Sequence, residues 1–141
     1  MGSRHKGRII AFQAIYSWSM NKNPLTEIIR FDWLKGAYRK VDEETLYFAR
    51  LLVTGTLENL IEIDSLVKKQ LENWDFSRLS RVDLAILRMS VFSLLYQKEI
   101  PPSVTIDEAI NIAREFGGDD SYRFVNGVLD GIKKVVQTEF Q

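Results

Sequence analysis

Apolar residues recur along this chain three or four positions apart, and no segment alternates strictly between apolar and polar residues. Helices with one buried face produce this spacing, whereas half-exposed strands show a period of two. The pattern therefore predicts an all-α fold, a compact helical bundle of about seven helices. We expect helices over about residues 4–20, 25–34, 41–74, 81–97, 105–116 and 119–136. Gly55 can bend the third segment or split it into two helices.

Several helices carry further signals. The helix over 81–97 is apolar in nearly every direction, which predicts a central and mostly buried element. Thr105 and Glu108 have the spacing of a capping box at the start of the next helix. Gly127 and Gly131 lie one turn apart in the last helix, where they would let a neighbouring helix approach closely.

Composition limits the class of protein. The chain has 141 residues and 45% hydrophobic content, enough for one domain or for two small subdomains that share a core. It has no cysteine, which excludes a disulfide framework and a cysteine-zinc site. Its apolar runs are too short for a membrane span or a signal peptide, so we expect a cytoplasmic protein.

Charge is distributed unevenly although the net charge is zero. Residues 1–40 hold eight Lys/Arg and two acids, a net charge of +6, so residues 41–141 carry −6. This polarity is expected when the basic end meets an anion and the acidic remainder meets a basic protein. A scatter of solvated charges fits the same numbers.

Catalysis is not indicated. The single histidine, His5, lies in the N-terminal tail, and the chain has neither a cysteine nucleophile nor a phosphate-binding glycine loop. The acid pairs 107–108 and 119–120 stand in first turns of expected helices, where capping explains them. We therefore expect no enzyme activity, no cofactor and no metal site.

A basic leader is the first candidate for binding. Arg4, Lys6 and Arg8 form a cluster without an acid, and Gln13 and Tyr16 follow on the same helix. Single-stranded RNA can use each component, because cations bind phosphate, an amide reads base edges and a ring stacks on bases. Ordinary surface residues behind a basic leader are the alternative.

Two further stretches carry unusual charges. Arg88 lies among apolar residues in "LAILRMSVF", so it either has a buried partner or reaches a ligand through a gap. In "FGGDDSYRFVNG", Asp120 can cap a helix whose first turn holds Tyr122, Arg123 and Phe124. These three side chains point about 100° apart and cannot share one core. They can form a stacking and phosphate-binding surface, or Phe124 can be core and Arg123 solvated.

Four stretches together resemble the NusB family of bacterial transcription antitermination factors: "AFQAIYSW" (11–18), "LSRVDLAILR" (79–88), "IPPSVTIDEAI" (100–110) and "FGGDDSYRFVNGVLDGI" (116–132). The resemblance implies two helical subdomains around a shared core, over about residues 1–75 and 76–141. It implies binding to boxA in nascent rRNA-leader transcripts as single-stranded RNA, jointly with ribosomal protein NusE, in an RNA polymerase elongation complex with other Nus factors. It implies no catalysis, and it leaves a homodimer possible.

The resemblance also assigns residues to surfaces. Those that would form or border the RNA surface are Arg4, Lys6, Arg8, Gln13, Tyr16, Arg88, Asp120, Arg123 and Phe124. Asp83 would lie on the side that faces NusE. A helical adaptor that binds only protein is the alternative function. The module also resembles the N-terminal domain of some rRNA cytosine methyltransferases, but no cofactor-binding catalytic domain follows here, so we expect no methyl transfer.

Overall fold

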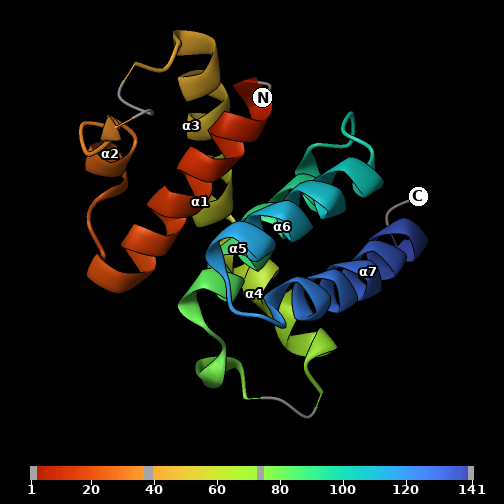
Figure 1. Cartoon of the computed structure of the whole chain (residues 1–141). Helices are drawn as coiled ribbons and strands as arrows, with labels where there is room; N and C mark the ends of the chain where they lie inside the picture. Colours follow the sequence, from red (N-terminus) through yellow and green to blue (C-terminus); the bar gives the residue numbers. More distant parts are fainter. Residues whose placement is uncertain (1–2, 37–39, 73–74, 140–141) are drawn as a thin grey trace.

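The fold is all-helical in the residues that the structure, a computed structural model, describes: 3–36, 40–72 and 75–139. Seven α-helices and one 3₁₀ helix occupy them: α1 (Ser3–Asn21), α2 (Leu25–Ile28), α3 (Glu43–Glu58), α4 (Leu60–Gln70), η2 (Phe76–Arg78), α5 (Arg81–Tyr96), α6 (Pro102–Phe116) and α7 (Ser121–Glu139) (Figure 1). The all-α prediction is confirmed. Within these ranges, no helix combines the length and apolar character that crossing a bilayer requires.

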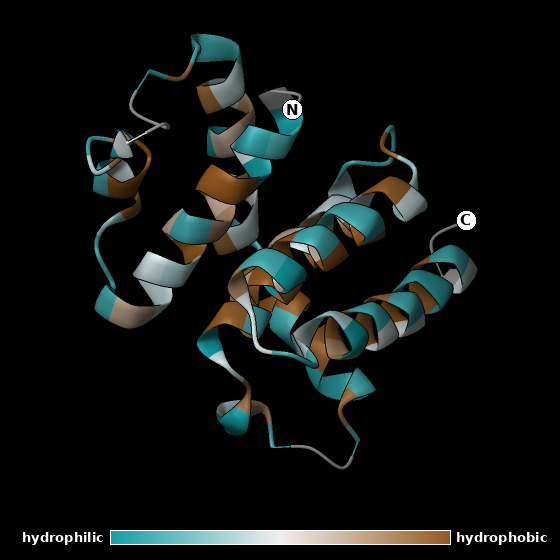
Figure 2. Cartoon of the chain, viewed as in Figure 1, coloured by the Kyte–Doolittle hydropathy of each residue, from teal (hydrophilic) through white to brown (hydrophobic). Residues whose placement is uncertain are grey.

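Helix α5 lies at the centre of the bundle, as its sequence predicts. Every residue from Asp83 to Leu95 is buried, and α5 packs against α1, α3, α4, α6 and α7. Apolar positions on the surrounding helices turn inward and polar ones outward (Figure 2). One hydrophobic cluster extends from Ile9 to Val136. The division into subdomains near residue 75 stays a prediction, because the core runs through both halves.

The second helix is shorter than the expected 25–34, and α2 ends at Ile28. Phe31 adopts a positive φ of 59°, and its side chain is only 5% exposed. The Trp33 Nε1–H donates to the Ile28 carbonyl at 3.0 Å. The helix therefore ends because the chain turns to bury Phe31, and an indole takes over one of the free carbonyls.

The expected segment 41–74 contains two helices, α3 and α4, and the break lies at Asn59 rather than at Gly55. The expected end at residue 74 lies outside the described residues. The Asn59 side-chain amide donates to the Gly55 carbonyl at 2.8 Å, where it competes with the helical backbone bonds. Gly55 instead permits close packing, because a Cβ there would lie 2.1 Å from the Phe92 ring.

The predicted capping box at Thr105 is wrong, because α6 begins three residues earlier at Pro102. Proline suits this position, since the first helical N–H has no partner within the helix. Thr105 is buried, and its hydroxyl has no hydrogen-bond partner among the described residues. Glu108 is therefore available for another contact, which it makes with α1.

The two glycines of α7 differ in their surroundings. A Cβ on Gly131 would meet the Gln70 side chain at 2.1 Å, so the predicted close approach is confirmed there. A Cβ on Gly127 would meet no atom within 4 Å among the described residues, so the prediction is wrong for Gly127. Helix α7 begins at Ser121, two residues later than expected.

Candidate nucleic-acid interface

The basic leader forms the first turns of α1 and has two faces. Arg4 and Lys6 are exposed, whereas Arg8 is 7% exposed and belongs to the buried polar residues. His5 does not lie in a free tail, because its Nδ1 is 2.7 Å from Glu108 Oε2 on α6. The same oxygen lies 3.7 Å from Arg8 Nη1. The leader thus presents two cations to solvent and turns two groups onto α6.

Helix α1 also contacts the far end of α6. The rings of Phe12 and Phe116 are 5.2 Å apart, and Phe116 is the last residue of α6 before the turn into α7. Gln13 and Tyr16 are half-buried on the same stretch of α1. The helix that carries the leader therefore adjoins the "FGGDDSYRFVNG" turn through this aromatic contact.

The turn itself is held by short-range hydrogen bonds. The Gly118 N–H donates to the Ser121 hydroxyl at 3.0 Å, and the Phe124 N–H donates to the Asp120 carbonyl at 3.2 Å. Asp120 is exposed, and its carboxylate lies 3.9 Å from Arg123 Nη1. These contacts fix the first turn of α7, where the aromatic and cationic side chains lie.

Tyr122 is approached by two guanidinium groups. The Arg123 Nε–H donates to the Tyr122 hydroxyl at 2.9 Å, and its Cζ lies 5.4 Å from the ring centroid. The Cζ of Arg114, on α6, lies 4.6 Å from the same centroid. Phe124 is half-buried and packs against the core. Sequence reasoning missed Arg114, because only the reversal of the chain between α6 and α7 brings it over Tyr122.

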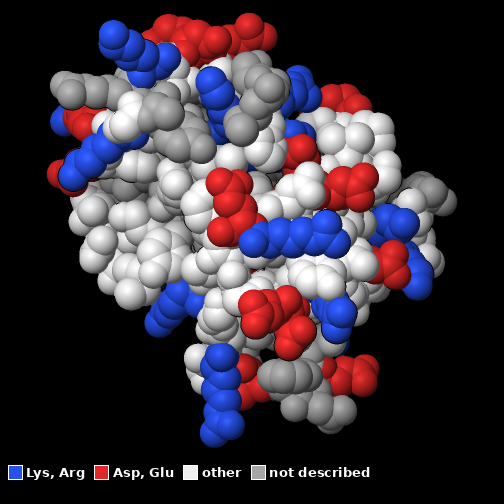
Figure 3. Space-filling model, viewed as in Figure 1, with Lys and Arg blue, Asp and Glu red and all other residues white. Residues whose placement is uncertain are grey.

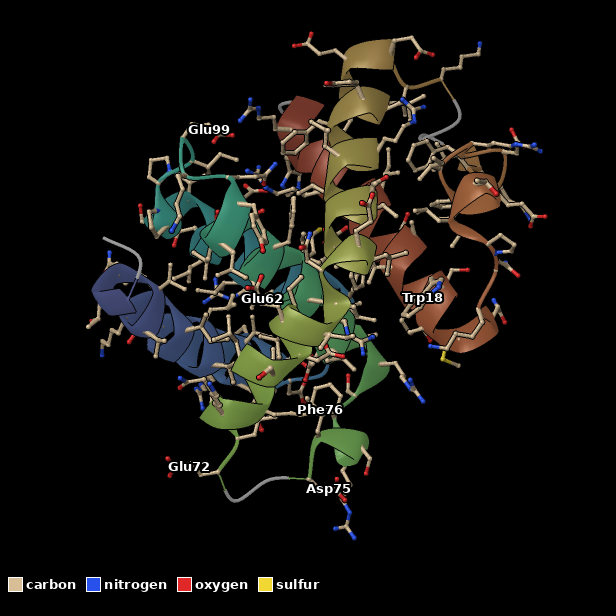
Figure 4. The ribbon with its side chains drawn as sticks, turned by 180° about the vertical axis from the view of Figure 1, so that it is seen from behind. Trp18, Glu62, Glu72, Asp75, Phe76 and Glu99 are labelled. Carbon is tan, nitrogen blue, oxygen red and sulfur yellow. The ribbon has the colours of Figure 1, made fainter. Side chains whose placement is uncertain are left out.

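Arg88 forms the buried ion pair that was one of its two alternatives. Its Nε and Nη2 both donate to the Asp64 carboxylate, each at 2.9 Å, and the residue is 7% exposed. The rings of Trp18 and Phe76 each lie 6.0 Å from its Cζ. Figure 4 shows these two aromatic side chains on α1 and η2. The guanidinium is enclosed rather than presented on the surface.

Asp83 is buried, which differs from the exposed position that a partner-facing acid requires. It is 9% exposed, and its Oδ1 has no hydrogen-bond partner among the described residues. Desolvation raises the pKa of the Asp83 carboxyl, and a hydrogen bond with Ser121 opposes the shift. Asp83 therefore lies beneath the start of α7.

Surface charge is mixed. On the face in Figure 3, Lys/Arg side chains alternate with Asp/Glu side chains among the residues drawn. The +6 of residues 1–40 is thus partly offset by acids from other elements, such as Glu108. In the ranges that the structure describes, no group of three or more His, Asp or Glu side chains could hold a metal ion.

Known proteins share both the sequence and the fold. The chain is 53% identical over 131 residues to the transcription antitermination protein NusB of Treponema pallidum (strain Nichols), across 93% of this chain and 92% of that protein. A structure of T. maritima NusB has a TM-score of 0.84 at 39% identity, covering 93% of this chain and 90% of that one. A crystal structure of antitermination factors NusB and NusE in complex with dsRNA has a TM-score of 0.80 at 24% identity, over 96% and 98% of the two chains, and shares the fold. The family model described as "NusB family" matches residues 5–134, and this chain therefore belongs to the NusB family.

Proposed function

We propose that the chain is a non-enzymatic transcription antitermination factor that binds boxA of nascent rRNA-leader transcripts as single-stranded RNA, together with ribosomal protein NusE. Its relative in Treponema pallidum is named a transcription antitermination protein. One structural neighbour was crystallised with NusE and dsRNA, and another, at 26% identity, is a chain in a crystal structure of a plectonemic RNA supercoil. The chain would act in the cytoplasm, on RNA polymerase elongation complexes that contain other Nus factors.

The observation that carries the RNA proposal is the arrangement around Tyr122. An aromatic ring with guanidinium groups at 4.6 and 5.4 Å combines a surface for base stacking with two charges for phosphate. Unpaired RNA exposes both its base faces and its backbone, whereas a duplex hides the base faces. The aromatic turn would therefore prefer a single strand.

Helix α1 would extend this surface. Arg4 and Lys6 supply exposed cations, and Gln13 and Tyr16 lie on the part of α1 that adjoins the end of α6. Arg88 would not contact RNA directly, because its guanidinium is paired with Asp64; it would border the surface only through the Trp18 and Phe76 rings near it. The family resemblance assigns Asp83 to the side that NusE would bind, but this buried residue lies beneath the start of α7 and could affect that side only through packing.

Substitution of the aromatic turn tests the proposal. We expect Phe124→Ala to weaken boxA binding by about 1–3 kcal/mol if one stacked base is lost, measured by titration of labelled boxA RNA. The control for loss of packing is Leu57→Ala, which truncates a half-buried apolar residue on a different helix, α3. Thermal unfolding of both variants gives the fraction of each that is folded at the assay temperature, and the affinities are corrected for it before they are compared.

The same titration separates the alternatives. Scrambled RNA, duplex boxA and added NusE form its other arms. Unchanged affinity of folded Phe124→Ala together with a collapsed melting temperature would assign Phe124 to the core. RNA binding through cations is strongest at low salt, and the logarithm of the affinity should fall with the logarithm of the salt concentration by a slope of about 0.7 per neutralised phosphate. A protein that binds NusE but shows no RNA affinity even at low salt would therefore be the protein-only helical adaptor.

A further inference from the structure

Glu108, on α6, contacts the basic leader at the start of α1. Its Oε2 lies 2.7 Å from His5 Nδ1 and 3.7 Å from Arg8 Nη1. His5 and Arg8 are three residues apart on α1 and so share one face of that helix. One carboxylate oxygen thus serves two groups of the leader.

Arg8 depends on this carboxylate. Its side chain is 8% exposed, and its Cζ lies 5.3 Å from the Phe48 ring centroid. Burial lowers the pKa of Arg8, the Glu108 charge raises it, and the neighbouring Arg4 lowers it further. In the part of the chain that the structure describes, Glu108 is the acid within salt-bridge distance of Arg8.

Helix α3 limits where the Arg8 side chain can lie. A Cβ on Gly7 would be 2.8 Å from Phe48 Cδ2 and 3.2 Å from the Thr45 carbonyl oxygen, so α1 and α3 are in close contact beside Arg8. The guanidinium therefore contacts both the Phe48 ring and the Glu108 carboxylate, and little of it is exposed to solvent.

A carboxylate and a phosphodiester make the same kind of charge-assisted hydrogen bond with a guanidinium. We propose that Glu108 is a positioning residue that competes with RNA phosphate for Arg8 and His5, and that it holds them inward until RNA displaces it. The inference rests on the proposed RNA-binding function. Without Glu108, Arg8 would be a buried cation without a counter-ion and would turn outward.

Glu108→Gln tests this inference, with Asp107→Asn as the matched control. Asp107 is the preceding and exposed residue of α6, so both variants change the net charge equally. We expect Glu108→Gln to bind boxA RNA more tightly and to steepen the dependence of log affinity on log salt by about 0.7 for each added phosphate contact. Asp107→Asn should leave the slope unchanged. In an Arg8→Gln background the extra slope from Glu108→Gln should be smaller, because only His5 remains to be released.

A second variant keeps the net charge constant. Glu108→Asp shortens the side chain by one methylene, and it should raise the affinity for boxA RNA as Glu108→Gln does. It replaces Glu108→Gln as the test if that variant does not fold. Equal slopes for the Glu108 and Asp107 variants, or weaker binding by folded Glu108→Gln, overturn the inference while wild-type binding to boxA still supports the proposed function. Equal wild-type affinity for boxA and scrambled RNA overturns the proposed function itself.

Discussion

The Arg88 guanidinium lies in the protein interior, where one carboxylate compensates the cost of burying its charge. Asp64, 24 residues earlier in the chain, accepts two hydrogen bonds from it. A bidentate arrangement satisfies both charged groups with fixed geometry. Removing one member leaves the other desolvated and unpaired, which costs more than the pair itself contributes.

Arg88→Met should therefore lower the free energy of unfolding by about 3–5 kcal/mol. The control is Arg78→Met, because the Arg78–Asp75 pair has side chains 85% and 59% exposed and should cost less than about 1 kcal/mol. Urea denaturation of both variants measures the difference. Similar losses for the two variants would contradict a stabilising role for the buried pair.

Single residues also show which site predictions sequence allows. Helix geometry showed that the three bulky side chains of the α7 first turn cannot share one core, and it left two roles open for Arg123 and Phe124. Arg123 is exposed and Phe124 is half-buried against the core, so their part in RNA binding stays a prediction. Glu108 was assigned to a local cap, whereas its partner His5 is 103 positions away. Local motifs contain no information on such distant pairs, and the burial of Asp83 was missed for the same reason.

At the level of helices, close packing of α3 on α5 depends on Gly55. The Phe92 ring occupies the space in which a Cβ would lie, so the two helices can be in contact at this point. Periodicity predicted one long helical segment here, and sequence offered Gly55 as a possible bend or split, whereas the break between α3 and α4 lies at Asn59. The break depends on the side-chain bond of Asn59, which competes with the backbone at a single residue.

Gly55→Ala should destabilise the protein by about 1–3 kcal/mol, since added volume in a packed core forces neighbours to move. Gly127→Ala should instead stabilise it by about 0.5–1 kcal/mol, because alanine costs less entropy in a helix interior and open space surrounds this position. Thermal unfolding compares the two. Phe92→Leu should recover part of the loss in Gly55→Ala, and no recovery would place the strain elsewhere.

For the molecule as a whole, the buried Asp83 makes stability depend on pH. Burial raises the pKa of its carboxyl above the ordinary 3.8, so the folded protein keeps a proton that the unfolded chain has already released. The free energy of unfolding from this group therefore falls as pH rises from 3.8 through the raised pKa. The exposed Asp42 and the partly exposed Asp130 have lowered pKa values, and they act in the opposite direction.

Asp83→Asn isolates this effect, because the other acids are common to both proteins. The variant should gain stability over wild type as pH rises from about 4, and the gain should level off above the folded pKa. Denaturation midpoints across this range measure the difference. A difference that does not vary with pH would show that Asp83 titrates alike in the folded and unfolded states.

Helix α1 carries the proposed leader cations and also supplies core residues, among them Ile9, Ile10 and Ile15, each 0% exposed. Arg4 and Lys6 therefore lie on a helix that is anchored in the core, and the backbone of this helix becomes ordered when the protein folds. Because the leader is already helical before RNA binds, little of its backbone entropy would be lost on association. Such a leader would favour RNA whose phosphates match the spacing of the two cations, and it would bind strands of other shapes weakly.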